Sequence, residues 1–274
     1  MRSAGWTGAF LAPALAICGA FFLVPLARLF AVGASGPSGY AAYIQVLGDL
    51  RYLTSFLSSV LLAGSVTLVS LFLSAVCGVY LSRARFAAKP FLTAVLTLPL
   101  AFPGVVVGFL VIMLGGRQGV VPQAVLAVGA EAGGAAVFAY SMTGLFVGYL
   151  YFSIPRCVLT VMATADKLDK DLEDAARTLG AQGFAIARDV ILPGIRPALV
   201  ASGAICFATA MGAFGTAFTL ATKINVLPMV IYTEFTLQAN LAIAAVLSLW
   251  LGLLTWVVLI AARSATGSAV AAAA

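Results

Sequence analysis

The sequence predicts an all-α membrane protein with about six transmembrane helices. Of its 274 residues, 63% are apolar and only 9% are charged, and the mean hydropathy is +1.12. This composition indicates helices surrounded by lipid, because a soluble domain needs a larger polar surface. The sequence contains no histidine, and its four cysteines stand alone in apolar segments, so we expect no catalytic residue, metal site or cofactor in this chain.

Six apolar runs are long enough to cross a bilayer. They cover about residues 9–27, 53–81, 90–114, 135–162, 198–220 and 241–262. The first run continues to Leu26, which is too long for a signal peptide, so we interpret it as an uncleaved span. Residues 120–128 are apolar but short, which predicts an interfacial or re-entrant piece. We expect residues 1–52 to form the first span and an outer loop, 53–263 a core with five spans, and 264–274 a disordered tail.

The third span contains two prolines, Pro99 and Pro103. Proline removes a backbone donor and disturbs the preceding turn, so a kink or break is expected inside the membrane. Such a break is tolerated only where protein or a water-filled cavity covers it. We therefore place this span, with Pro103, beside a translocation pathway; a kink that only improves packing is the alternative.

A long polar interval, residues 166–193, separates the fourth and fifth spans and is called the polar loop below. It holds six of the nine acids: Asp166, Asp169, Asp171, Glu173, Asp174 and Asp189. Apolar residues recur at helical spacing from Leu168 to Leu179, and Gly180 can take the left-handed position that ends a helix. The loop therefore predicts two short helices around a turn, the second of which stops at Pro193.

The polar loop also carries a motif with defined spacing. Asp174-Ala175-Ala176 is followed after three residues by Gly180, and after nine more by Val190, Leu192 and Pro193. This pattern resembles the cytoplasmic signature loop of binding-protein-dependent ABC importer permeases, where Glu and Ile replace Asp174 and Val190. The resemblance implies a type I ABC importer permease fold, whose coupling helix contacts an ATPase through Asp174, Ala175, Ala176, Gly180, Leu192 and Pro193. An ordinary amphipathic loop helix is the alternative.

The same resemblance implies partners for the chain. These are ATP-binding cassette subunits that hold ATP and Mg, a second permease subunit (identical or homologous) and an extracytoplasmic solute-binding protein. The sequence has no G-x-x-x-x-G-K-[ST] motif, so ATP hydrolysis is expected on the partner and this chain is not expected to be an enzyme. The net charge of +6 comes without a dense basic run, which argues against nucleic acid. The distribution of Lys and Arg favours a bacterial inner membrane with both termini and the polar loop in the cytoplasm.

Arg156 lies inside the fourth apolar run, about ten residues before the polar loop. A guanidinium there costs at least ~2.5 kcal/mol unless it finds water or a partner. Arg156 is therefore a candidate for lining the pathway, and a structural ion pair or snorkelling is the alternative. Gly215, in a cluster of small residues, is a second candidate, although packing within one subunit is as plausible. Glu234 is a third, although an exposed loop acid is the favoured interpretation.

The substrate is harder to infer. Residues 212–236 resemble permeases for polyamines, ferric iron and phosphonates, and the first prediction is a polyamine such as spermidine or putrescine, moved inward by ATP-driven alternating access. An anion such as a phosphonate or a sulfate-like ion, or ferric iron, is the alternative, and a pathway containing Arg156 would favour the anion. An ion-coupled secondary transporter is the alternative from another class, but it would need intramembrane acids that the spans lack.

Overall fold

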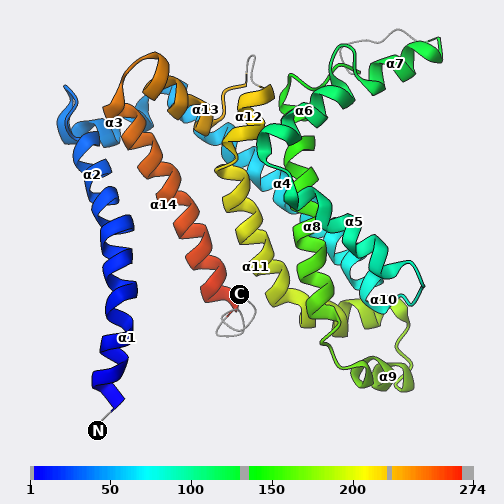
Figure 1. Ribbon diagram of the computed structural model, residues 1–274. Helices are drawn as coiled ribbons and strands as arrows, with labels where there is room; N and C mark the ends of the chain where they lie inside the picture. The colour runs from blue at the N-terminus through cyan, green and yellow to red at the C-terminus, as the bar shows by residue number, and fades with distance from the viewer. Residues whose placement is uncertain (1–2, 130–135, 221–223, 267–274) are drawn as a thin grey trace. The chain divides into compact units, whose positions relative to one another are not determined.

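The computed structural model describes residues 3–129, 136–220 and 224–266, and every regular element in them is helical (Figure 1). The N-terminal elements are α1 (Ser3–Cys18), η1 (Gly19–Leu23), α2 (Val24–Gly33), η2 (Gly39–Ala41), α3 (Ala42–Gly48) and α4 (Leu50–Arg83). The central elements are α5 (Lys89–Ala101), α6 (Gly104–Gly115), α7 (Val120–Ala127), α8 (Met142–Ala165), α9 (Lys170–Thr178) and α10 (Gly183–Ile186). The last elements are η3 (Ala187–Ile191), α11 (Leu192–Met211), α12 (Phe214–Leu220), α13 (Leu227–Tyr232), η4 (Thr233–Leu237) and α14 (Leu241–Thr266).

Six helices in the described part of the chain are long and apolar enough to cross a membrane. They are Leu11–Gly33, Leu50–Arg83, Gly104–Ala127, Met142–Ala165, Gly183–Met211 and Leu241–Ala265. The predicted all-helical fold with six spans is therefore confirmed. The third span differs in its limits, because the predicted run of 90–114 is divided between α5 and α6.

The chain forms two compact units. The first comprises Met1–Ser55 and Val230–Leu253, and the second comprises Phe56–Met229 and Leu254–Ala274. In the first unit, Tyr43 joins three segments: its hydroxyl donates to the Phe30 carbonyl at 2.7 Å, and its own carbonyl accepts from Trp250 Nε1 at 3.1 Å. The predicted domain limits at residues 52 and 263 remain predictions. Helix α14 continues through Thr266, and the remainder of the expected disordered tail, 267–274, lies outside the described residues.

In the second unit, α8 packs against α5, α6, α11 and α12. Val161, Ala165 and Ile195 form a fully buried cluster where α8 and α11 meet, and side chains from α4 and the polar loop pack against it. Helices α9 and α10 lie at this end of the unit (Figure 1). The short apolar segment expected at 120–128 is helix α7.

The predicted break in the third span is present. Helix α5 ends at Ala101, Phe102 and Pro103 are extended, and α6 begins at Gly104. A second break, which the sequence analysis did not predict, divides the fifth span between α11 and α12. There the backbone turns tightly at Gly212, whose carbonyl accepts from Phe214 N at 2.8 Å.

The polar loop forms the two predicted helical segments. Asp169 caps α9, since its side chain accepts from Asp171 N at 3.0 Å. Gly180 ends this helix with φ of +84°, and Ala181 N reaches back to the Ala176 carbonyl. The prediction that the second helix stops at Pro193 is wrong, because helical structure runs from Gly183 to Met211. The π-helical turn η3 ends two residues before Pro193 and contains Asp189, whose carbonyl the proline ring would meet in a regular α-helix.

Candidate functional site

Both helix breaks of the second unit border one pocket of about 380 Å³. The break between α5 and α6 contributes Phe102 and Gly104, and the break between α11 and α12 contributes the segment 212–216. Helix α8 supplies Phe152 and Arg156. Irregular backbone at membrane depth is tolerated where it lines a cavity, and both breaks satisfy that condition. Pro103, the predicted pathway residue, lies between the two lining residues of the first break.

Arg156 is held on one side of this pocket by a single side-chain hydrogen bond. Its Nη1 donates to Thr209 Oγ1 at 2.9 Å, and the Thr209 hydroxyl donates in turn to the Ile205 carbonyl at 2.7 Å. Among the described residues that line the pocket, Arg156 alone is charged, and within the described chain no acid lies within ion-pair distance of it. The structural ion pair considered for Arg156 is therefore not observed there, and the guanidinium remains available to a ligand or to water.

The breaks are held in place by hydrogen bonds from side chains to the backbone. Tyr149 on α8 donates its hydroxyl to the Ala213 carbonyl at 2.7 Å, and Thr216 on α12 donates to the Gly104 carbonyl at 2.9 Å. Gly215 lines the pocket and also touches α6, since a methyl group there would lie 3.0 Å from Val105 N. Gly215 thus serves the contact between α6 and α12 as well as the pocket wall, so both interpretations of this residue remain.

Glu234 lies in the first unit, separate from the other three pathway candidates. The expectation of an exposed loop acid is wrong, because the residue is fully buried. Its Oε1 accepts from the Tyr52 hydroxyl at 3.1 Å and pairs with Arg51 Nη1 at 3.0 Å. Two partners from the start of α4 therefore compensate the burial of this carboxylate.

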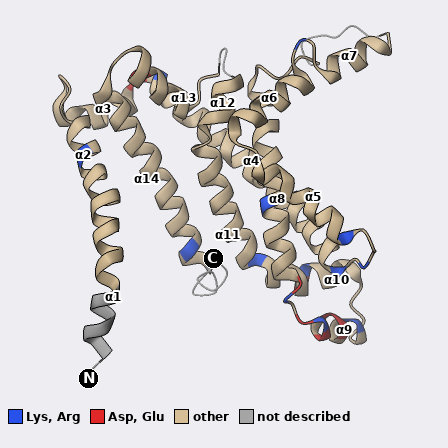
Figure 2. Cartoon of the chain, viewed as in Figure 1, with Lys and Arg blue, Asp and Glu red and all other residues tan. Residues whose placement is uncertain are grey.

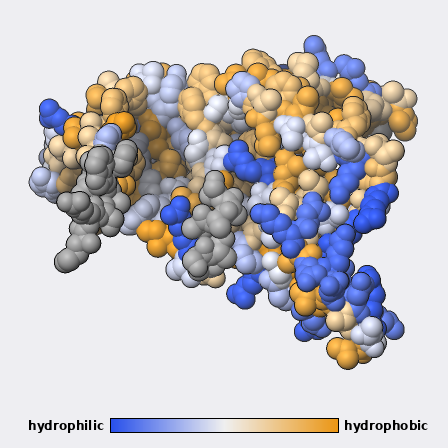
Figure 3. Space-filling view, turned by 60° about the horizontal axis from the view of Figure 1, so that its bottom comes forward, coloured by the Kyte–Doolittle hydropathy of each residue, from blue (hydrophilic) through white to orange (hydrophobic). Residues whose placement is uncertain are grey.

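The acids concentrate on α9, whereas most charges on the long helices are single Lys or Arg residues (Figure 2). The motif residues Asp174, Ala175, Gly180, Leu192 and Pro193 are all exposed, and Ala176 is half-buried. Leu172 of α9 is also exposed instead of packing inward. Leu179 and the nearby Phe184 are 88% and 81% exposed, and this end of the unit is hydrophilic with apolar patches (Figure 3). Such a mixed surface is typical of a site that binds another protein.

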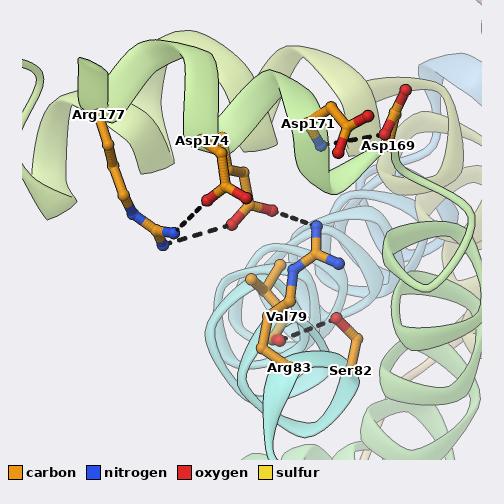
Figure 4. A network of polar contacts seen from close by, with 8 residues as sticks. Val79, Ser82, Arg83, Asp169, Asp171, Asp174 and Arg177 are labelled. Atoms are coloured by element: carbon orange, nitrogen blue, oxygen red, sulfur yellow. Dashed lines mark hydrogen bonds and ion pairs between the residues drawn. The ribbon is translucent and has the colours of Figure 1, made fainter. Parts of the chain in front are cut away.

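One acid of α9, Glu173, points toward the membrane helices instead of toward water. Glu173 is buried and pairs with Arg83 at the end of α4, while its other oxygen lies 3.9 Å from Arg177 (Figure 4). The neighbouring Asp174 is exposed and pairs with Arg177 at 2.7 Å. From the sequence, Glu173 was only one of six acids in the polar loop, and its contact with Arg83 was not predicted. The available signal was the helical spacing, which sets adjacent residues on different faces.

Comparisons with known proteins agree with this arrangement. Residues 70–265 match the family described as binding-protein-dependent transport system inner membrane component. The putative 2-aminoethylphosphonate transport system permease protein PhnU of Salmonella typhi is 27% identical over 243 residues, covering 87% of this chain and 84% of that protein. The sulfate transport system permease protein CysT of Salmonella typhimurium is 32% identical over 203 residues, covering 69% and 71%.

A molybdenum transport system permease protein, ModB of Escherichia coli, is 31% identical over 183 residues, covering 64% of this chain and 78% of that protein. A chain of the crystal structure of a bacterial alginate ABC transporter, in complex with a pentasaccharide-bound periplasmic protein, has the same fold. Its TM-score is 0.81 at 16% identity, over 94% of both chains. The names of the three relatives refer to a phosphonate, sulfate and molybdenum. They do not support the predicted polyamine, and they favour the anion alternative.

These similarities extend over the membrane helices and the polar loop together, well beyond the short signature motif on which the first resemblance rested. The chain belongs to the binding-protein-dependent transport system inner membrane components, the permease subunits of ABC importers.

Proposed function

We propose that this chain is the permease subunit of an importer for a small oxyanion, of the sulfate, molybdate or phosphonate kind. The observation that carries the substrate class is the isolated positive charge of Arg156 on the pocket. At a separation of about 4 Å and an effective dielectric constant of about 20, one unit charge contributes about 4 kcal/mol. That contribution attracts an anion and repels each ammonium group of a polyamine, so the sign of the charge supports the anion over the polyamine.

The polar loop is proposed to be the contact with the ATP-binding subunits. Its exposed motif residues and the exposed Leu179 and Phe184 form a surface suited to a protein groove. In this proposal the loop and both termini lie in the cytoplasm, and the membrane is the bacterial inner membrane. ATP and Mg bind to the partner subunits, a second permease completes the pathway, and a solute-binding protein delivers the anion from outside.

Transport would then follow alternating access. ATP-driven closure of the two ATPases moves α9, and the packed helices of the second unit carry this movement to the pocket. The breaks next to Phe102 and Gly212 supply positions at which the halves of these two spans can change their angle. Arg156 stabilises the anion while the pocket is closed to both sides, because a charged ligand loses part of its hydration there.

The test is uptake into proteoliposomes with the ATPase and solute-binding protein that co-purify with this chain. We would compare labelled sulfate, molybdate, 2-aminoethylphosphonate and spermidine for the wild type and for Arg156→Lys, Arg156→Gln and the control Arg117→Gln, which changes an exposed loop arginine. Uptake of the transported anion should fall by roughly tenfold to a hundredfold in Arg156→Gln, equivalent to about 1.5–3 kcal/mol for a charged hydrogen bond. It should fall less in Arg156→Lys and not in the control. ATP-dependent spermidine uptake by the wild type would overturn the anion proposal.

A further inference from the structure

Arg83 is the last residue of α4, and its guanidinium is largely enclosed. The side chain is 21% exposed, and its Nε and Nη1 are buried without a hydrogen-bond partner. Among the residues that the structure describes, Glu173 is the sole side chain that pairs with Arg83, through Nη2 (Figure 4). A buried cation with no second partner depends strongly on the one it has.

Glu173 and Asp174 are adjacent carboxylates with opposite surroundings. The side chain of Glu173 is 10% exposed and faces α4, whereas that of Asp174 is 67% exposed. Helix α9 therefore has one side tied to α4 and another side open to a partner. The open side includes the motif residues already proposed to contact the ATPase.

Helix α4, which belongs to the second unit from Phe56 onward, differs from the other long helices of that unit in its continuity. It runs for 34 residues without proline, a length of about 50 Å at 1.5 Å per residue. By contrast, α8 contains Pro155, and α11 contains Pro197 and follows the π-helical turn η3. Helices usually bend at prolines, Gly-Ser pairs and π turns. Beyond the Gly64-Ser65 pair, α4 has none of these, so a force applied to Arg83 moves the segment 66–83 as one body.

We propose that the Arg83–Glu173 pair transmits the movement of α9 to α4 and so couples ATP hydrolysis to transport. Both are positioning residues that contact neither the ATPase nor the solute. The inference rests on the proposed role of the polar loop as the ATPase contact. The side of α9 that faces α4 is then as necessary for coupling as the exposed side, and α4 is the helix that the pair moves.

The experiment measures solute transported per ATP hydrolysed in proteoliposomes of the whole transporter, together with the amount of ATPase that co-purifies. The variants are Glu173→Gln, Arg83→Gln and the double variant, and the control is Asp189→Asn, which changes an exposed acid of the same loop. We expect the ratio to fall about tenfold in all three variants, within the roughly 5–150-fold range of coupling between sites. The ATPase should be retained because the open side of α9 is intact, and the control should match the wild type.

The double variant also decides whether the two residues act as a pair. Removing both charges leaves no lone buried ion, so its ratio should be no lower than that of either single variant. If the single variants do not accumulate in the membrane, the solute transported per ATP hydrolysed by the double variant alone tests the proposal. A wild-type ratio in the double variant would overturn the proposal, and so would loss of the ATPase from Glu173→Gln. A wild-type chain that retains no ATPase would instead overturn the proposed function.

Discussion

In the first unit, the ion pair between Arg51 and Glu234 allows us to predict which of the two residues is more costly to replace. Glu234 is fully buried, whereas the Arg51 side chain is 49% exposed, and their closest atoms are 3.0 Å apart. At that distance the attraction is about 5 kcal/mol at an effective dielectric constant of about 20, and hydration of Arg51 reduces it. The two partners are therefore unequal, because only one of them can return to water when the other is removed.

We expect Arg51→Gln to destabilise the chain more than Glu234→Gln. The first change leaves the buried carboxylate with neutral donors, the Tyr52 hydroxyl and the Gln238 amide, which costs about 3 kcal/mol. The second keeps an oxygen that can accept from Tyr52 and frees Arg51 to meet water, which costs about 1 kcal/mol. At roughly 2–4 °C per kcal/mol, the melting temperatures should fall by about 6–12 °C and about 2–4 °C.

The assay is thermal unfolding of the purified chain in detergent, followed by tryptophan fluorescence, with Arg117→Gln as the control for loss of an exposed arginine. Equal shifts, or a larger shift for Glu234→Gln, would show that the burial argument is wrong. Substrate selectivity measured on Glu234→Gln addresses the other interpretation of this residue. A changed selectivity would return Glu234 to the pathway, and an unchanged one would leave it as a structural acid.

Two further predictions concern glycines. In Gly108→Ala the new methyl group would lie 2.5 Å from Thr219 Cβ, so α6 and α12 must separate. We expect the free energy of unfolding, measured by thermal unfolding, to fall by about 1–3 kcal/mol. The control Gly64→Ala, whose methyl group meets nothing within 4 Å, should not lower it. Gly180→Asp places a side chain at φ +84° beside the acids of α9, at a strain of about 1–2 kcal/mol. The variant should insert normally but release the ATPase in co-purification, and normal transport by it would contradict the coupling role of the polar loop.

The two helix breaks show what the sequence can and cannot reveal. The break between α5 and α6 can be predicted from Pro103, because a proline lacks the backbone donor that a continuous helix needs. Gly212 carries no such signal, since glycine in a membrane helix is as often a packing residue. Its break is held by the hydroxyl of Tyr149, which belongs to another helix, so the information is tertiary and absent from the local pattern.

For the charged residues too, some features could be predicted from the local sequence and others depend on distant contacts. The motif spacing predicted a membrane permease with a water-facing loop, and the family match confirms the permease. The rotation of α9 about its own axis determines which acid of the loop faces Arg83 and is buried. Arg83 lies 90 positions before Glu173 in the chain. The burial of Glu234 depends on Tyr52, 182 positions away. Contacts at that separation are not encoded in periodicity, so both acids were expected on exposed surfaces.

The exposed leucine and phenylalanine of the polar loop also bear on how cells handle this protein. Leu179 and Phe184 reach water on the proposed topology unless a partner covers them. Exposed apolar side chains of this kind are what chaperones and proteases select in quality control. An excess of the permease over its ATPase should therefore be removed by proteolysis, and the abundance of the permease should follow the abundance of its partner.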